Sequence, residues 1–505
     1  MSLHGMLSWL VVKCPWIPVL FLIPCCIIYD TIAFIRFRWA SIFHSRDTRR
    51  HEERVQHVQE QVREWKKSGS TATMCTARPG YQSITLQTLK YKKSCQKIEI
   101  NMPDIISIDT EKKTVRVEPM VTIGQLNDYL IGRGWTLPVV PELDDLTIGG
   151  LVMGGGIEST SHKYGLFQYI CRMYEMVLAD GSVVQCSRDH MTDLWVAIPF
   201  SYGTLGFLTA VDLDIIPFKK YIKLTYIPVE GLDNVVEVLE KETRDPANDS
   251  VEGILYSLNE AVIMTGVFTD ECENWRLNKI GRWFKPLFHA HVKQFLKPED
   301  TIPKVEYIPT LHFFHRHDKS CFWLVDYIVP FINHWIFRWF FGWTMPPKHA
   351  MIKILKEKFV PPNMLNQFVC QDLAVQFKHL KGLAELSDEM TKVYPIWLCP
   401  CNHLLTPEQE KFSMFKWNDL NVDFGVYGFT GVKSYHPVEG QKRFEKYMID
   451  NEGFPALYAE TQFTEEEFRQ MVNLDTYERL RRELNCEGAF PHLYEKVSKL
   501  GRTSI

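Results

Sequence analysis

The segment from Thr147 to Ser187 holds the residues whose types and spacing most clearly indicate chemistry. Five glycines lie between Gly149 and Gly156, and the hydroxyls of Ser159, Thr160 and Ser161 follow them. Glycine lets a backbone approach a ligand closely, and a nest of backbone N–H groups beside hydroxyls can hold a pyrophosphate. The spacing matches neither the Rossmann G-x-G-x-x-G turn nor the P-loop. We therefore expect a dinucleotide held by another fold.

A second group of candidate residues is basic. His315, Arg316 and His317 are consecutive, and His312 precedes them. Arginine keeps its charge and would clamp or polarise a ligand, whereas histidine can donate a proton near neutral pH. A polar surface patch or a structural hydrogen-bond cluster would use the same residue types, so the sequence leaves both interpretations open.

The composition limits the class of protein. The 505 residues suffice for two or three domains, and 46% of them are hydrophobic and 23% charged, as in ordinary globular proteins. The net charge of −4 argues against a protein dedicated to nucleic acid. The 13 cysteines form no paired C-x-x-C sets, which favours reduced thiols and a body facing the cytosol. Cys399 and Cys401 form a lone C-x-C, and we predict no metal site.

The N-terminus is typical of a membrane anchor. An apolar run covers residues 14–35, interrupted by Asp30, and gives roughly the 20 residues that span a bilayer. Six arginines follow it between Arg36 and Arg54, against Lys13 alone before it. The positive-inside rule then places residues 1–13 in the lumen and the body in the cytosol. A cleaved signal peptide is the alternative, but the arginines lie on the wrong side for it.

The elements that must position the candidate residues follow from the sequence periodicity. Residues 36–70 combine the basic segment with an amphipathic helix from His51 to Lys67, which we expect to pack on the next domain. Residues 71–225 form that domain, with a helix from Val121 to Gly134 capped by Thr122. Its expected strands are Ile98–Ile100, Ile105–Ile108, Thr114–Val117, Met176–Leu178, Ser182–Val184 and Gly206–Ile216.

Two further regions complete the chain. Residues 226–440 form a second domain, and residues 441–505 form a helical tail. The expected elements are a helix at Gly231–Arg244, paired strands at Val251–Thr265, and helices at Glu465–Val472 and Thr476–Leu484. The aromatic run from Trp335 to Trp343 is too short to span a bilayer. We interpret it as a buried segment, with contact to one lipid monolayer as the alternative.

Three patches of the first domain resemble the flavin-binding domain of the vanillyl-alcohol oxidase/p-cresol methylhydroxylase family. They are Cys75–Gly80, similar to the family's Arg-x-Gly turn; Val117–Leu126, similar to its strand-Pro-helix signature; and the glycine segment with Ser201–Leu208, similar to its second flavin-contacting loop. The resemblance implies an α+β fold. A two-lobed FAD-binding domain would be joined to an α+β substrate or cap domain, behind an N-terminal transmembrane helix.

Longer motifs are similar to the Δ24-sterol reductase, or diminuto, family from about residue 50 to the C-terminus. These motifs are Pro141–Thr147, Gly156–Ser159, Ser161–Leu166, His315–His317 and Tyr394–Pro400. The family implies an FAD-dependent, NADPH-consuming oxidoreductase that reduces the C24 side-chain double bond of a sterol. It also implies the endoplasmic reticulum membrane, with the Golgi membrane as a second location. Neither spacing nor composition indicates that substrate.

The resemblance also assigns cofactor residues. The FAD is expected to be non-covalent, because Tyr81–Ser83 offers neither the histidine nor the cysteine that many relatives use for attachment. The expected FAD contacts are Arg78, Gly80, Thr147, Ile148, Gly149, Gly150, Leu151, Val152, Met153, Gly154, Gly155, Gly156, Ile157, Glu158, Ser159, His162, Gly203, Thr204 and Gly206. No Rossmann fingerprint marks a separate NADPH site, so NADPH is expected to visit the flavin face.

Reduction of an isolated alkene needs a hydride on one carbon and a proton on the other. The candidates for the catalytic groups are Tyr458, His315, His317 and Arg316. Tyr458 is included because C-terminal residues of this flavoprotein family often fold back over the flavin. A buried structural tyrosine is the other interpretation.

Two other functions stay open. The first is an FAD oxidase or dehydrogenase of the same fold that acts on an alcohol or hydroxy acid. The second is a membrane-anchored, flavin-binding interaction protein, suggested by Asp318–Ser320 and Leu324, where the chain departs from the reductase pattern. The expected partners are a sterol, NADPH and a lipid bilayer, without nucleic acid, and the sequence does not indicate an oligomeric state.

Overall fold

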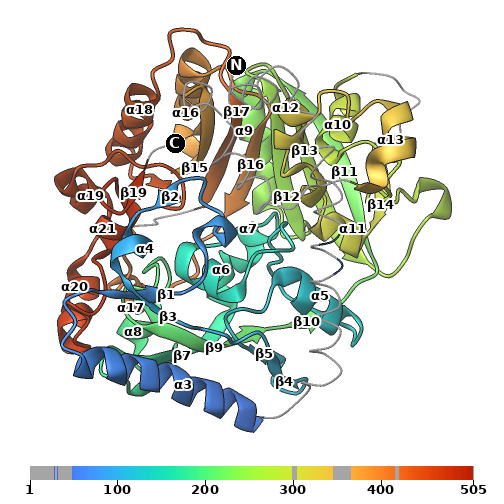
Figure 1. Cartoon of the computed structure of the whole chain (residues 1–505). Coiled ribbons are helices and arrows are strands. Elements are labelled where there is room, and N and C mark those ends of the chain that lie inside the picture. Colours follow the sequence, from blue (N-terminus) through green and yellow to red (C-terminus); the bar gives the residue numbers. More distant parts are fainter. Residues whose placement is uncertain are drawn as a thin grey trace, which may run out of the picture.

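The computed structural model describes residues 48–297, 304–344, 366–415 and 420–503, together with Ile28 and Thr31. The fold is α+β, with two antiparallel sheets that lie one above the other in Figure 1. Within the described residues no helix has the length and apolar character needed to cross a bilayer. The anchor expected at residues 14–35 lies outside them, apart from Ile28 and Thr31.

The first sheet has five strands in the order β4-β5-β9-β7-β8. Their bounds are β4 (Ile105–Asp109), β5 (Thr114–Val117), β7 (Cys171–Val177), β8 (Val183–Ser187) and β9 (Phe207–Asp214). The hairpin expected across Asp180 is confirmed, because Val177 pairs with Val183. Helix α3 (Thr48–Lys67) packs on this sheet and buries Val55, Val58 and Val62, as its periodicity predicted.

A layer of short helices connects the two sheets and carries the glycine-rich segment (Figure 1). It consists of α5 (Ile123–Ile131), α6 (Ile148–Gly154), α7 (Ser161–Tyr164) and α8 (Thr192–Ala197). Thr122 caps α5 in a capping box with Gln125, which confirms that expectation. Strand β1 (Met74–Thr76) runs parallel to β3 (Gln96–Ile98), and β6 (Trp135–Thr136) pairs with β10 (Ile216–Pro217).

The second sheet has eight strands in the order β14-β11-β13-β12-β16-β17-β15-β18. Their bounds are β11 (Tyr221–Glu230), β12 (Ser250–Ser257), β13 (Glu260–Thr269), β14 (Val305–Pro309), β15 (Phe368–Gln376), β16 (Ile396–Cys401), β17 (Asn421–Phe429) and β18 (Phe454–Pro455). Apolar residues of one face form a core with α9 (Leu232–Arg244), α16 (Phe377–Met390) and α18 (Pro437–Asp450). The opposite face turns toward the first sheet, so residues that alternate along each strand meet the glycine-rich layer.

The C-terminal segment crosses back from the second sheet to the first domain. It contains β18, α19 (Glu465–Met471), α20 (Asp475–Glu483), α21 (Leu493–Val497) and β19 (Arg502–Thr503), which pairs with β2 (Thr88–Leu89). The Lys496 ammonium donates to the Tyr202 carbonyl, and Arg481 Nη1 donates to the Thr204 carbonyl at 2.7 Å. The tail therefore supports the loop around Gly203.

The connection between β14 and β15 includes a helix whose exposure differs from our expectation. The helices here are α11 (Thr310–Phe314), α12 (Leu324–Ile328) and α13 (Trp335–Phe341). Trp335, Trp339 and Phe340 are 60%, 56% and 67% exposed, so the prediction that Trp335–Trp343 is buried was wrong. Only Phe337 and Arg338 of α13 are half-buried. The remaining short helices are α4 (Tyr91–Ser94), α10 (Phe288–Val292) and α17 (Pro407–Glu410).

Candidate active site

The glycine-rich segment begins at a capped helix. Thr147 precedes α6, and its hydroxyl accepts a hydrogen bond from the Gly150 N–H at 3.4 Å. The same hydroxyl accepts from Arg78 Nη1 at 2.7 Å, while Arg78 Nη2 donates to the Gln82 carbonyl at 3.0 Å. Arg78 thus joins the turn at Gly80–Gln82 to the start of α6, as the two predicted motifs would require.

Two loops meet at the end of α6. The Tyr202 N–H donates to the Met153 carbonyl at 3.1 Å, which ties the loop around Gly203 to the stretch Met153–Ile157. That stretch is continuously half-buried, whereas the side chains of Ile148, Leu151 and Val152 lie in the hydrophobic core. Within the described part of the chain, the backbone N–H groups of Gly156, Ile157 and Gly203 have no hydrogen-bond partner.

The glycines serve two different purposes. A Cβ on Gly149 would lie 2.8 Å from Pro119 Cβ, and one on Gly155, where φ is +91°, would lie 2.5 Å from the Phe200 ring. A Cβ on Gly206 would lie 2.9 Å from the Val177 carbonyl. These three positions need glycine for close packing inside the protein. A Cβ on Gly154 would lie 3.7 Å from the Tyr202 hydroxyl, an ordinary contact, so packing inside the protein does not require glycine there.

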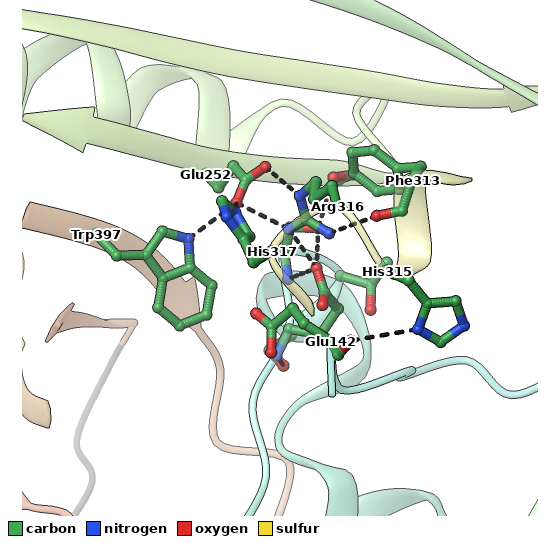
Figure 2. A network of polar contacts seen from close by, with 12 residues as sticks. Glu142, Glu252, Phe313, His315, Arg316, His317 and Trp397 are labelled. Carbon is green, nitrogen blue, oxygen red and sulfur yellow. Dashed lines mark hydrogen bonds and ion pairs between the residues drawn. The ribbon is translucent and has the colours of Figure 1, made fainter. Parts of the chain in front are cut away.

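Arg316 lies at the centre of a buried polar network between the two sheets (Figure 2). Its Nε and Nη2 donate to the two oxygens of Glu252 on β12, at 2.6 and 2.8 Å. Nη2 also donates to Glu158 at 2.6 Å, and Nη1 donates to the Phe313 carbonyl at 3.0 Å. Trp397 Nε1 donates to Glu252 Oε2 at 2.8 Å. Each of the three guanidinium nitrogens therefore donates to a protein oxygen.

The pKa values of the carboxyls in this network are shifted away from their ordinary values. Burial alone would raise the pKa of Glu252, but the Arg316 charge and the hydrogen bonds from His317 and Arg316 hold that pKa well below its usual range. Burial raises the pKa of Glu158, and burial together with the Glu158 charge raises the pKa of Glu142 well above its usual range. Glu142 is therefore a buried carboxyl whose neutral form is favoured by its surroundings.

His317 is neutral in this setting. Burial lowers its pKa to about 4 despite the neighbouring Glu252. Its Nε2 lies 3.3 Å from Glu252 Oε2, so the proton belongs on Nε2, and within the described residues Nδ1 has no hydrogen-bond partner. The His317 ring stacks on Phe322 with centroids 4.8 Å apart. Arg316 and His317 are thus brought together as predicted, but as buried groups whose polar hydrogens are already bound.

His315 lies apart from this pair and faces the first domain. Its Nδ1 is 2.9 Å from Asp144 Oδ1 and 3.2 Å from the Glu142 carbonyl oxygen. Its Nε2 is 3.4 Å from Asn127 Nδ2. Burial would lower the pKa of His315, but the hydrogen bond and charge of Asp144 raise it above the ordinary value. His315 therefore joins the loop before α6 to the end of α11.

Tyr458 belongs to a second polar group on the same face of the second sheet. The hydroxyls of Tyr458 and Tyr427 donate to the two oxygens of Asp372. Burial raises the pKa of Asp372 to about 7, and burial together with Asp372 raises the pKa of Asp423 well above its usual range. Two adjacent buried carboxyls cannot both ionise readily, so this pair keeps at least one proton at neutral pH.

The Tyr458 group also lies beside the glycine-bearing loops. Phe454, at the start of its segment, contacts Phe200 with ring centroids 5.4 Å apart, and the Phe200 ring is the neighbour that excludes a Cβ at Gly155. Tyr458 is half-buried, in contrast to the fully enclosed Arg316 and His317. Of the four predicted catalytic residues, Tyr458 therefore combines access with a proton-holding partner.

Comparison with known proteins extends this picture to the whole chain. The chain is 45% identical to the Delta(24)-sterol reductase of Homo sapiens over 499 residues, which cover 98% of this chain and 96% of that protein. It is 37% identical to the Delta(24)-sterol reductase homolog of Caenorhabditis elegans, over 96% of this chain and 95% of that protein. The chain belongs to the Delta(24)-sterol reductase family.

The family assignment agrees with the match of the N-terminal part. A family model described as an FAD binding domain matches residues 53–187, and a 142-residue segment, 28% of this chain, is 30% identical to the L-gulonolactone oxidase of Mus musculus. The N–H groups of Gly156, Ile157 and Gly203 are donors suited to phosphate oxygens. In this member of the Delta(24)-sterol reductase family, these loops fit FAD.

Three residues that we expected to contact FAD, namely Glu158, Ser159 and His162, bind other protein groups in the structure. The Ser159 hydroxyl and N–H donate to Glu158 at 2.6 and 2.7 Å. The two ring nitrogens of His162 lie 3.0 and 3.2 Å from the carbonyl oxygens of Ser159 and Asn248, and burial lowers the pKa of His162. All three residues are buried between the sheets and join the FAD-binding domain of this family member to β12.

Sequence reasoning missed the partners that the second sheet supplies. These residues are Glu252 on β12, Asp372 on β15, Trp397 on β16, and Asp423 and Tyr427 on β17. A signal was present, because a carboxylate interrupts the otherwise apolar stretches of β12, β15 and β17, as in VEGILYS and NVDFGVYGF. In the described residues no group of His, Cys, Asp and Glu could hold a metal ion.

Proposed function

We propose that this protein is an FAD-dependent reductase that uses NADPH to reduce the C24 double bond of a desmosterol-like sterol. The observation that supports this most is the 45% identity to Delta(24)-sterol reductases over 98% of the chain. The match is nearly complete in length, so it includes the second sheet and its polar groups as well as the FAD-binding domain.

FAD, bound without a covalent attachment and reduced by NADPH, would supply the hydride. The protein must then place the alkene and provide the proton for the second carbon. We propose that Tyr458 holds that proton at its hydroxyl oxygen. Asp372 accepts from this hydroxyl and, together with Asp423, retains a proton at neutral pH. The pair would reprotonate Tyr458 after each turnover.

Arg316, His317 and His315 would hold other parts of the site in place and would not react with the sterol themselves. The Arg316 guanidinium is bound on every side by Glu252, Glu158 and the Phe313 carbonyl, so it keeps the loop at Glu158 in register with β12. The proton of His317 faces Glu252. The rings of Phe322 and Trp397 pack on His317, with centroids 4.8 and 6.3 Å from it, and Tyr427 packs on Phe322. Such rings exclude water from the neighbourhood of the reaction.

We also propose that the protein is a single-pass protein of the endoplasmic reticulum membrane, and of the Golgi membrane, with its body in the cytosol. The support is the apolar run at residues 14–35 and the six arginines that follow it. An N-glycosylation tag placed before residue 14 should be glycosylated in microsomes, whereas the same tag after residue 503 should not. The reverse pattern would exclude this orientation.

An anaerobic titration tests the enzymatic proposal. The detergent-solubilised full chain should show a flavin absorption band that NADPH bleaches and that desmosterol then restores. A flavin band that NADPH cannot bleach would favour the oxidase or dehydrogenase alternative. Bleaching by NADPH without recovery on addition of a Δ24-sterol would favour the interaction-protein alternative. A colourless protein that added FAD cannot restore would contradict the cofactor itself.

A further inference from the structure

The segment around α13 presents an unusual concentration of exposed aromatic side chains. We call the set formed by Trp283, Trp335, Ile336, Trp339, Phe340, Phe341 and Trp343 the aromatic platform. Each member is at least 42% exposed, and Phe340 reaches 67%. Large hydrophobic residues scattered singly over a surface need no explanation, but a contiguous group of them marks an interaction site.

The platform is fixed from behind. The rings of Phe284 and Trp339 stack with centroids 5.2 Å apart, and Phe337 packs on Phe331 and Phe341. Phe337 also packs against the small core of Val325, Val329 and Ile332. Because the inner side chains hold α13 in place, the outward direction of the others is built into the fold.

The two chain segments that supply the platform carry charges of one sign, and Asp326 on α12, an acid that contacts them, is bound to His289 and Asn333. Residues 279–297 and 331–344, which supply the platform and its surroundings, contain no aspartate or glutamate. They do contain six cations, namely Lys279, Arg282, Lys285, Lys293, Lys297 and Arg338. Exposed tryptophans beside lysine and arginine are the composition that lies at the boundary between lipid headgroups and acyl chains. A cationic surface also suits anionic headgroups.

A cavity leads from the platform toward the candidate active site. Its outer wall includes Trp283, Arg338 and Gly342, and its inner wall includes Phe288, His315 and Arg316. The space open to water molecules is about 40 Å³, enough for a few of them. The cavity therefore brings solvent from the platform to His315 but is too small to hold a sterol.

We propose that the aromatic platform docks on the surface of a phospholipid bilayer and so holds the body where it can take up sterol from that bilayer. The route for the sterol rests on the proposed reductase function, whereas the docking surface stands on the platform and its charge. A bilayer is favoured over a protein partner or a second copy of the chain because a tryptophan-rich surface flanked by lysine and arginine matches lipid. The apolar run at residues 14–35 would also keep the body beside a membrane.

Site-specific photo-crosslinking tests the docking surface without any requirement for activity. A p-benzoylphenylalanine is placed at position 340 or, as a control, at position 500, because Phe340 and Leu500 are both 67% exposed. The full chain is reconstituted in vesicles of phosphatidylcholine, with and without phosphatidylserine. Crosslinks to phospholipid at position 340 and not at 500 are expected, with a higher yield when phosphatidylserine is present. Crosslinks between two copies of the chain, or equal lipid crosslinking at both positions, would overturn the proposal.

Steady-state kinetics test the sterol route. We expect the double substitution Trp335→Ser, Phe340→Ser to raise the apparent KM for desmosterol presented in vesicles by at least about tenfold. The kcat in vesicles, and both constants for sterol presented in detergent, should stay unchanged, because neither side chain lines the cavity. Leu500→Ser serves as the matched control. An equal KM change in vesicles and in detergent would overturn the route. If the unaltered chain reduces no sterol, the proposed function fails, and the crosslinking result alone still decides the docking surface.

Discussion

At the scale of single residues, the two polar groups on the second sheet differ in what their protons can do. The group around Arg316 contains ionised, fully enclosed side chains whose donors already have acceptors. The group around Asp372 contains two hydroxyl donors and two carboxyls that retain a proton. A proton can leave the second group more easily than the first, because loss of a proton from Arg316 would leave the buried carboxylates of Glu158 and Glu252 without their counter-ion.

The first prediction concerns Tyr458. Tyr458→Phe removes the hydroxyl but keeps the ring, so it should lower kcat for sterol reduction by about 10²–10⁴-fold, the usual contribution of a positioned proton donor. NADPH should still bleach the flavin at the rate of the unaltered protein. Stopped-flow spectroscopy of the two half-reactions separates these effects. Glu142→Gln is the comparison, because burial and the Glu158 charge also raise the pKa of Glu142. A larger loss in Glu142→Gln than in Tyr458→Phe would assign the proton elsewhere.

The pH dependence should identify the partner of Tyr458. Since the pKa of Asp372 is raised to about 7, the protonated form that can resupply Tyr458 is lost as the pH rises through that value. We expect kcat for sterol reduction to fall above about pH 7 and Asp372→Asn to lack that step while having a lower kcat throughout. A decline that persists unchanged in Asp372→Asn would show that another group titrates.

At the scale of elements, helix α3 shows how a predicted amphipathic helix is fixed in register. Its valines bury the apolar stripe, but the charges at its start determine where it sits. His51 lies 2.9 Å from both Glu118 and Glu175 through its two ring nitrogens. Arg54 and Arg116 contact the same two carboxylates at 2.7 Å. The apolar stripe could be predicted from the sequence. The pairing of His51 with carboxylates 67 and 124 residues away could not.

This arrangement predicts alkaline weakening of the helix contact. Burial would lower the pKa of His51, but the hydrogen bonds to Glu118 and Glu175 raise it to about 9 from an ordinary value of 6.5. A raised pKa gives stabilisation that is complete below about pH 6.5 and is lost as the pH rises through about 9. The loss is at most about 3 kcal/mol. We expect Tm to decline across this window in the unaltered protein.

The control for this pH effect is His51→Gln, which should have a lower Tm at neutral pH and a flatter profile. The difference between the two proteins isolates His51 from other groups, such as Lys496, whose pKa burial lowers to about 8. Parallel profiles for the two proteins would show that His51 is not charged in the folded state.

At the scale of the whole molecule, the sequence was informative where the chain contacts itself locally or approaches a cofactor. Helix α5, strand β5 and the glycine segment could be predicted because caps, alternation and backbone freedom depend on near neighbours. The pairing of Glu252 with Arg316 and of Arg316 with Glu158 spans 64 and 158 residues. It follows from how two sheets face one another, which no local pattern contains.

For α13, the prediction from the sequence was wrong. The run Trp335–Trp343 is apolar enough for a core, and burial was the natural expectation from composition. Whether such a segment is buried depends on whether another element covers it. In the described structure the inner residue Phe337 meets a core, and the outer tryptophans do not. The alternative of contact with a lipid monolayer, considered from the sequence, is the one that the exposure favours.

The two sheets share one hydrophobic core and are also joined through buried polar contacts, which the last prediction addresses. The Val251 N–H donates to the Ser159 carbonyl at 2.9 Å, and Ser250 donates to the Ser159 hydroxyl at 2.8 Å. Arg316 adds the only buried cation that links Glu158 to Glu252 within the described residues. Arg316→Leu leaves these carboxylates without their counter-ion, so it should cost about 3–5 kcal/mol and loosen the FAD-binding domain from the second sheet.

Arg316→Lys should be intermediate, because it keeps the charge but loses the two-point contact with Glu252. The measurements are Tm and flavin content. Bound FAD contributes a further stabilisation, about 2.7 kcal/mol at a hundredfold excess over Kd, so added FAD should recover part of the Tm of the Leu variant. Arg443→Leu, which removes an exposed pair with Glu389, is the control and should change stability by less than about 1 kcal/mol. If Arg316→Leu behaves like this control, the buried network does not join the sheets, because a counter-ion whose removal costs nothing cannot be holding two carboxylates in place.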